Sequence, residues 1–301
     1  MRTFRNARFL TRFSLLTALL TLLAPAQGQE ATVKENVAYV QDGHERHVLD
    51  VYAPAGAKNA SVVFWIHGGG WQAGDKSDVQ SKPKAFNEKG YVFISTNYRL
   101  LPHVPMETIM ADLAKSLKWV HENIAEYGGD PNRVIVGGHS AGAQLAALLC
   151  TDEKWVGAEG LKLSMFTACI PVDGDTYDIP AIIETEEIRR RAHGQSLPTF
   201  GHRQKFGNDP VKHVDFSAVT HARAGKGIPP FYIMFVAGHP YTSIQAQSLA
   251  EALKKAGIKA VLYGAAESTH NKVNAEIGNP DDPGTGGLFE LLDAVAPAHS
   301  K

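Results

Sequence analysis

The sequence predicts an α/β fold, in which a mostly parallel central sheet is covered by helices on both faces. Along most of the chain, predicted strands alternate with predicted helices, as parallel strands joined by helical crossovers do. One predicted strand, residues 62–69 (VVFWIHGG), begins with an unbroken apolar run, which is typical of a strand buried on both faces of its sheet. With 301 residues, 44% of them hydrophobic, the chain can bury one large core, and we expect a single domain.

The individual elements follow from local patterns. Apolar residues recur at helical spacing from Met106 to Tyr127, where GGDP ends the helix. Further helices are predicted over 140–150 and Ala246–Ala256. Short apolar runs predict the strands, which are residues 48–54, 62–69, 91–98, 133–138, 165–172, 231–237 and 260–264. The interval 177–228 contains several prolines and the charged run ETEEIRRR, and it is predicted to be an insertion over the strand ends rather than a second domain.

The first 26 residues have the layout of a secretory signal peptide. Four arginines precede an apolar run over 13–24, which small residues follow. The run is shorter than the roughly 20 apolar residues that a membrane span needs, so an uncleaved anchor is the weaker alternative. We therefore expect a mature domain over 27–301, located in the periplasm or secreted, without a stable membrane span after cleavage.

Composition and spacing argue against nucleic-acid binding, a disulfide-stabilised fold and a zinc site. The chain has 30 Lys and Arg against 31 Asp and Glu, so it offers no basic surface for nucleic acid. Cys150 and Cys169 both lie in apolar segments, which favours two buried thiols over a disulfide. The run His44–His47 lacks the spacing of a zinc motif and is predicted to be a solvated polar segment. No metal or cofactor site is predicted, and the sequence does not indicate the oligomeric state.

The motif GHSAG, residues 138–142, is the main candidate for chemistry. It matches the pattern G-x-S-x-G between a predicted strand and a predicted helix. A sharp turn at this point would expose the Ser140 hydroxyl, and the flanking glycines would permit the close packing that such a turn causes. A plain turn serine is the alternative, but the strand–turn–helix setting favours a nucleophile.

A second glycine-rich motif, HGGGW at 67–71, follows the apolar strand. Consecutive glycines leave backbone N–H groups uncovered, and acyl transfer needs such donors for its oxyanion. By the logic of the motif, Gly69 and Gly70 donate together with Ala141, the residue after the nucleophile. A phosphate-binding loop is the alternative, but the Lys-Ser/Thr pair or dinucleotide spacing that it needs is absent.

A serine nucleophile needs a base, and the chain has 13 histidines. His270 is the candidate, because STHN follows the last predicted strand, where the order Ser, acid, His requires the base. His139 is next to Ser140 and is expected to pack or to form local hydrogen bonds. His239 is a weaker rival.

These segments together resemble a known family. LDVYAP, IHGGGWQAGDKSD, GYVFISTNYRL, the long segment through GHSAG, DGDTYDIP and ESTHNKVN are similar to α/β-hydrolase serine esterases of the hormone-sensitive-lipase and bifunctional feruloyl and acetyl-xylan-esterase-like group. The resemblance spans nearly all of the expected mature chain. It implies the α/β-hydrolase fold and a serine esterase, and it leaves the substrate open between small-molecule and polysaccharide-linked esters.

The resemblance also reveals a departure in the catalytic acid. In similar proteins an Asp stands after the strand that corresponds to 231–237, whereas this chain has Tyr241 there. A phenol is neutral near pH 7 and cannot replace a carboxylate. Asp173 is the best substitute, since some similar hydrolases carry the acid after the neighbouring strand. A loop-capping role is the alternative for Asp173, and Asp178 and Glu267 are weaker candidates for the acid.

The sequence thus predicts a serine hydrolase that cleaves carboxylic esters through an acyl-enzyme on Ser140. Two rivals remain at this point. An amidase or arylformamidase would use the same motifs, although the predicted signal peptide disfavours it. A binding protein on an esterase scaffold would explain Tyr241, although it would not explain why Ser140, His270 and the glycine-rich loop are all present.

Overall fold

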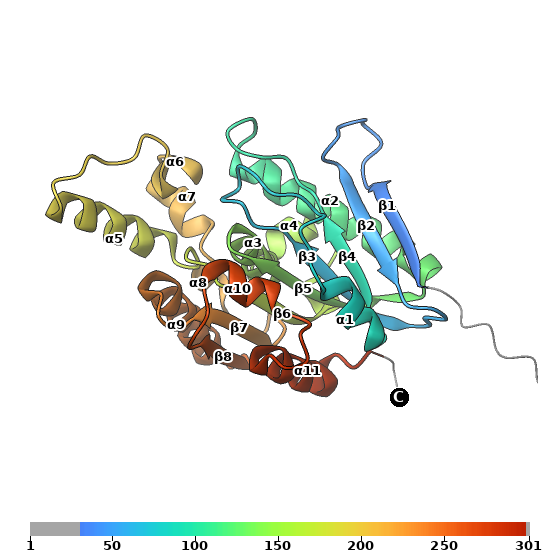
Figure 1. Ribbon diagram of the computed structural model, residues 1–301. Helices are drawn as coiled ribbons and strands as arrows, with labels where there is room; N and C mark the ends of the chain where they lie inside the picture. Colours follow the sequence, from blue (N-terminus) through green and yellow to red (C-terminus); the bar gives the residue numbers. More distant parts are fainter. Residues whose placement is uncertain (1–30, 299–301) are drawn as a thin grey trace, which may run out of the picture.

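A sheet of eight strands forms the centre of the computed structural model, which describes residues 31–298 (Figure 1). The order across the sheet is β1-β2-β4-β3-β5-β6-β7-β8. The strands are β1 Thr32–Ala38, β2 Val48–Ala53, β3 Ala60–Ile66, β4 Val92–Thr96, β5 Gly129–His139, β6 Phe166–Val172, β7 Phe231–Val236 and β8 Ala260–Ala265. From β4 to β8 all neighbours pair in parallel, while β2 is antiparallel to both β1 and β4. The predicted mostly parallel α/β sheet is therefore confirmed.

The core strands formed where the apolar runs predicted them. All seven residues of β3 are buried, as expected for a strand covered on both faces. The strand β1 was not predicted, because its sequence TVKENVA is mostly polar and its first five residues are exposed. It lies at the edge of the sheet, where its side chains are largely exposed, so the strand does not need an apolar pattern.

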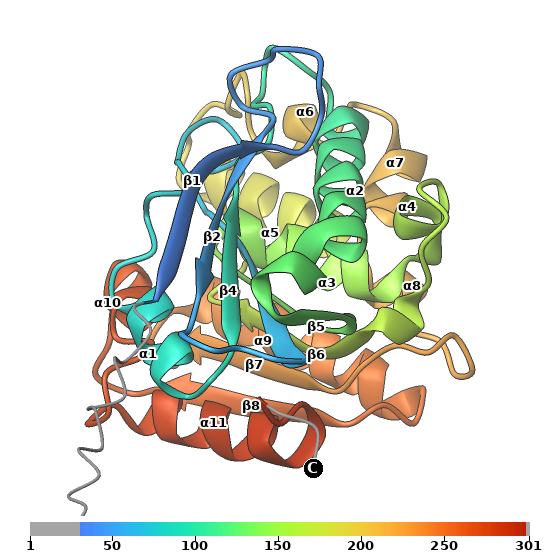
Figure 2. The same ribbon diagram turned by 90° about the vertical axis from the view of Figure 1, so that its right-hand side faces the viewer.

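Helices cover both faces of the sheet (Figures 1 and 2). One apolar core packs beneath α2 (Met106–Asn123), α3 (Ala141–Thr151) and α9 (Pro240–Lys255). A second core lies on the other face, beneath α1 (Lys82–Glu88), α10 (His270–Ala275) and α11 (Pro283–Val295). Outside the insertion there are also the short helix α4 Glu153–Gly157 and the 3-10 turns η1 Ile124–Tyr127 and η2 Leu163–Met165.

Two predicted helices differ at their ends. The helix predicted over 106–127 changes to the 3-10 turn η1 for its last four residues, and Gly128 ends it in the left-handed conformation. The helix predicted from Ala246 begins six residues earlier, at Pro240. Proline suits the first helical position, and His239 caps the N-terminus of the helix. Helix α10 and helix α11 were not predicted, since their segments are short or rich in glycine.

The predicted insertion 177–228 carries four helices: α5 Ile179–Ala192, α6 His202–Lys205, α7 Pro210–Asp215 and α8 Ala218–His221. Helix α5 is held at its start by the buried side chains of Ile179, Ile182 and Ile183 and projects away from the sheet in Figure 1. Most of the large apolar side chains that are exposed lie on this insertion, including Ile188 and Val211.

Three further predictions concern the ends of the chain and its cysteines. The predicted signal peptide lies outside the described residues. Within residues 31–298, no helix is both long and apolar enough to cross a membrane. Cys150 and Cys169 are buried free thiols, as predicted.

Candidate active site

The GHSAG motif forms the sharp turn between β5 and α3. Ser140 has φ 56° and ψ −121°, a strained conformation for a residue with a side chain. The flanking glycines make this possible by close packing. A Cβ atom on Gly138 would lie 2.4 Å from the Gly142 carbonyl oxygen, and one on Gly142 would lie 2.2 Å from the Ile66 oxygen. The turn therefore holds Ser140 at the end of the sheet.

Ser140 and His270 line the same cavity, which has a volume of about 530 Å³. It lies at the carboxyl ends of the parallel strands, the usual place for sites in such sheets. The HGGGW loop after β3 forms one wall, and α10 forms another. The remaining lining combines the polar side chains of Asp78, Gln80, Asn271 and Asn274 with Trp65 and Ala275.

His270 pairs with Asp173, a residue 97 positions earlier in the chain. The His270 Nδ1 atom lies 2.6 Å from Asp173 Oδ2. Asp173 follows β6 directly and is 1% exposed, with φ 50°. Its Oδ1 accepts a hydrogen bond of 2.9 Å from the Val236 N–H, and its own N–H donates to Met234 O at 2.8 Å. Contacts with β7 thus fix the carboxylate under the imidazole.

The pKa values of this pair diverge. The hydrogen bond to Asp173 is the largest influence on the pKa of His270 and raises it, while burial opposes the rise. Burial acts to raise the pKa of Asp173, but the hydrogen bonds from His270, Val236 and Thr242 outweigh burial and hold it below its ordinary value. Asp173 is therefore ionised near pH 7 and accepts from Nδ1, which leaves Nε2 of neutral His270 free to accept a proton.

The predicted oxyanion-hole donors gather beside Ser140. Gly69 and Gly70 have φ 106° and 61°, and a Cβ on Gly69 would lie 2.2 Å from the Ala73 oxygen. Among the hydrogen bonds of the described residues, none uses the N–H of Gly69 or Gly70. Ala141 is the first residue of α3, where an N–H has no partner within the helix. These three N–H groups are available to an oxyanion.

Comparison with known proteins agrees with this geometry. The family model BD-FAE matches residues 49–173, which include the HGGGW loop, the GHSAG turn and Asp173. The matched segment is 125 of the 301 residues, and over it the chain is similar to BD-FAE. The predicted resemblance to esterases of the hormone-sensitive-lipase-like group is confirmed.

Individual relatives of this chain are esterases by name. Esterase LipQ of Mycobacterium tuberculosis is 26% identical over 80% of this chain and 57% of its own length. Carboxylesterase NlhH of the same species is 38% identical over 38% of this chain and 36% of its own. The chain thus spans less than two thirds of the length of either relative. An inhibited esterase B from Lactobacillus rhamnosis has a TM-score of 0.70 at 21% identity, covering 88% of this chain and 87% of its own, and shows the same fold.

The rival histidines make other contacts. The Nε2 atom of His139 lies 2.8 Å from the carbonyl oxygen of His270, and the two ring centres are 4.5 Å apart. Burial, aided by the charge of His270, lowers the pKa of His139 to about 4, so His139 stays neutral and supports the His270 backbone. His239 caps α9 and accepts from the Thr242 N–H at 3.4 Å.

The rival positions for the acid are also occupied otherwise. Tyr241 lies in the first turn of α9, where its ring is 5.9 Å from that of His239 and 5.5 Å from the Arg189 guanidinium. Asp178 caps α5 by accepting from the Ala181 N–H at 3.2 Å. Glu267 is exposed. Of these candidates, Asp173 is the carboxylate that hydrogen-bonds His270.

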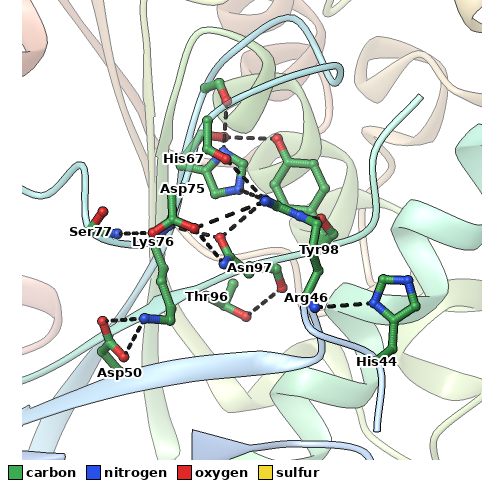
Figure 3. A network of polar contacts seen from close by, with 12 residues as sticks. His44, Arg46, Asp50, His67, Asp75, Lys76, Ser77, Thr96, Asn97 and Tyr98 are labelled. Carbon is green, nitrogen blue, oxygen red and sulfur yellow. Dashed lines mark hydrogen bonds and ion pairs between the residues drawn. The ribbon is translucent and has the colours of Figure 1, made fainter. Parts of the chain in front are cut away.

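The run His44–His47 was predicted to be solvated, and this holds for His44 and Glu45, which are exposed, but not for Arg46 and His47. His47 is 1% exposed, and its ring lies between Asp42 at 2.9 Å and Asp112 at 3.1 Å. Arg46 reaches inward to His67 of the glycine-rich loop (Figure 3). This contact could not be predicted from the sequence, because Arg46 and His67 are 21 residues apart and belong to different loops.

The insertion borders the site through α6. The rings of His202 and Phe206 meet the buried Trp71 ring edge-on, at 6.0 Å and 5.0 Å between centres. The ammonium of Lys205 lies 5.3 Å from the centre of the Trp71 ring. Every residue lining the cavity around Ser140 comes from outside the insertion.

Among the described residues, one group of side chains has the donor atoms that could bind a metal ion. Asp152, Asp215 and His221 bring ligand atoms within 4.8 Å of one another. Lys154 contacts both carboxylates, so its ammonium takes the place that a cation would need. None of these residues lines the cavity around Ser140.

Proposed function

We propose that this protein is a serine hydrolase that cleaves carboxylic esters through an acyl-enzyme on Ser140. One observation carries the proposal: His270 lines the same cavity as Ser140 and is hydrogen-bonded at Nδ1 to the buried carboxylate of Asp173. The match to BD-FAE and the named esterases among the relatives support the same reaction.

The reaction follows from the roles of the groups. The Ser140 hydroxyl attacks the ester carbonyl while His270 Nε2 accepts its proton, and Asp173 stabilises the imidazolium that forms. The N–H groups of Gly69, Gly70 and Ala141 donate to the oxyanion. When the intermediate collapses, His270 returns the proton to the departing alcohol. Water then attacks the acyl-enzyme while His270 accepts its proton. His270 returns this proton to the Ser140 oxygen as the carboxylic acid is released.

Hydrolysis of short-chain p-nitrophenyl esters tests this proposal. The purified protein is expected to release p-nitrophenol from the acetate and butyrate, and Ser140→Ala is expected to abolish release above background. Thermal unfolding of both proteins controls for folding. Equal rates for the wild type and Ser140→Ala would exclude Ser140 as the nucleophile.

The substrate class and location are part of the proposal. The side chains of Asp78, Gln80, Asn271 and Asn274 can hydrogen-bond a polar alcohol group, which favours a small or sugar-linked ester. A panel of esters that varies acyl length and alcohol polarity is expected to favour short acyl groups on polar alcohols. The Arg-rich, then apolar, N-terminal segment favours a secreted or periplasmic protein. Cell fractionation tests the location.

A further inference from the structure

A half-buried arginine, Arg46, fixes the proton of His67, the first residue of the HGGGW loop. The Arg46 Nη2 atom lies 3.0 Å from His67 Nε2 (Figure 3). A guanidinium has only donors, so Nε2 must accept, and the single proton of a neutral imidazole must then be on Nδ1. The His67 side chain stacks on Tyr98, with ring centres 4.4 Å apart and planes 10° apart, so the ring cannot turn freely.

The proton on Nδ1 in turn orients a peptide unit of the predicted oxyanion hole. His67 Nδ1 lies 2.7 Å from the Gly68 carbonyl oxygen and donates to it. That carbonyl shares a planar trans peptide unit with the Gly69 N–H, so the two groups point in opposite directions. Holding the Gly68 oxygen toward the His67 ring therefore aims the Gly69 N–H away from the ring.

The opposite tautomer would disturb this arrangement. With the proton on Nε2, the Nδ1 lone pair would face the Gly68 oxygen at 2.7 Å, and the two acceptors would repel. Three glycines in a row resist rotation of the peptide unit only weakly. The Gly69 N–H would then leave the position that an oxyanion requires.

Several contacts hold Arg46 in place for this task. Its Nε donates to Tyr98 O at 2.6 Å. Its Nη2 lies 3.0 Å from Gly74 O and 3.1 Å from Asn97 Oδ1, so the two Nη2 protons are shared among these two acceptors and His67 Nε2. Burial lowers the pKa of His67 to about 4, so the ring remains neutral at ordinary pH. A doubly protonated ring would have no acceptor for Arg46.

We propose that Arg46 is a positioning residue for the oxyanion hole: it fixes the tautomer of His67, which aims the Gly69 N–H at the reaction centre. This inference rests on the proposed ester hydrolysis at Ser140. It assigns a role in the reaction to a residue that touches neither the substrate nor the reacting atoms.

The test compares Arg46→Met with Lys76→Met. Lys76 belongs to the same buried network and pairs with Asp50 at 2.9 Å, but it makes no hydrogen bond to His67 (Figure 3). Both variants are expected to unfold at lower temperature than the wild type. Because an oxyanion hole acts in the transition state, Arg46→Met is expected to lower kcat about 10- to 100-fold with KM nearly unchanged. Lys76→Met is expected to keep kcat within about threefold.

Nitrogen-15 NMR of the histidine rings gives a readout that does not depend on activity. The His67 signals are assigned by their loss in His67→Asn. We expect the Nδ1–H tautomer in the wild type and in Lys76→Met, and a mixture or the Nε2–H tautomer in Arg46→Met.

The outcomes separate this inference from the proposed function. An Nε2–H tautomer in the wild type, or full kcat in Arg46→Met, would overturn the role of Arg46 while ester hydrolysis at Ser140 stands. Equal loss of kcat in both Met variants would reduce Arg46 to a general stabilising role. If Ser140→Ala hydrolysed esters as fast as the wild type, the proposed function would fail, whatever the tautomer.

Discussion

Asp173 has the burial and contacts that a catalytic carboxylate needs. It is 1% exposed and forms hydrogen bonds to His270 and to the backbone of β7. In Asp173→Asn the amide oxygen can still accept from the Val236 N–H, so the protein should fold. The amide nitrogen would then face His270 Nδ1 and favour the tautomer whose Nε2 already carries a proton.

We therefore expect Asp173→Asn to lower kcat on a simple ester at least ~100-fold; the same change in serine proteases costs roughly 10⁴-fold. Steady-state kinetics with p-nitrophenyl acetate measures the effect, and circular dichroism controls for folding. A folded Asp173→Asn variant with full activity would remove Asp173 from the mechanism.

Tyr241 is expected to have little influence on the reaction. Its ring contacts His239 and Arg189 rather than His270. Tyr241→Asp should therefore leave kcat within about threefold of the wild type, because Asp173 already supplies the carboxylate for His270. A matched Tyr241→Phe variant separates the added charge from the lost hydroxyl. A large gain in activity from Tyr241→Asp alone would mean that Asp173 does not serve His270 in solution.

The pH dependence of the reaction follows from the raised pKa of His270. The base must be neutral to accept the Ser140 proton, so kcat/KM should increase with pH through the pKa of His270. Because Asp173 raises that pKa, the inflection should lie above the ordinary histidine value of about 6.5. In Asp173→Asn the residual activity should have its inflection at lower pH. An inflection that is the same in both proteins would contradict the pairing.

At the scale of elements, the turn from β5 into α3 depends on glycine packing against β3. A methyl group on Gly142 would lie 2.2 Å from Ile66 O and 2.6 Å from His67 O. Gly142→Ala should therefore destabilise the protein by about 3 kcal/mol or more and impair activity. Gly157→Ala is the matched control, since a methyl group at the end of α4 meets nothing within 4 Å. Urea unfolding compares the two, and similar stability for both variants would refute the close packing.

The elements that sequence patterns predicted well are those whose residues are apolar along their length. The runs of β3 and β5 and the helical spacing of α2 are buried as expected. Among the elements that were missed, β1 lies at an edge of the sheet, and short helices such as α10 are held by tertiary contacts. In α10, for example, only Val273 is buried, so its own sequence does not specify a helix.

At the scale of the whole molecule, the sheet brings together residues from distant parts of the chain. The glycine-rich loop follows β3, Ser140 follows β5 and Asp173 follows β6, which are adjacent parallel strands. Motifs and strand order could therefore predict Ser140, His270 and their surroundings. The sequence alone could not decide between Asp173 and the other carboxylates, because that choice depends on which side chain lies within hydrogen-bonding distance of His270.

The same limit applies to Arg46. A polar run between an edge strand and β2 has the composition of a surface loop, and only the closed fold turns its Arg46 and His47 side chains inward. Long-range polar contacts of this kind leave no periodic pattern in a single sequence.

The most direct measurement of the central claim is the rate at which a fluorophosphonate labels Ser140. This reaction requires an activated serine and an oxyanion hole but no particular ester. Peptide mass mapping is expected to locate the label on Ser140 in the wild type within minutes, and labelling of folded Asp173→Asn is expected to be at least ~100-fold slower. Absence of label on the folded wild type, or equal rates for the two proteins, would contradict the assignment of Ser140, His270 and Asp173 as one catalytic unit.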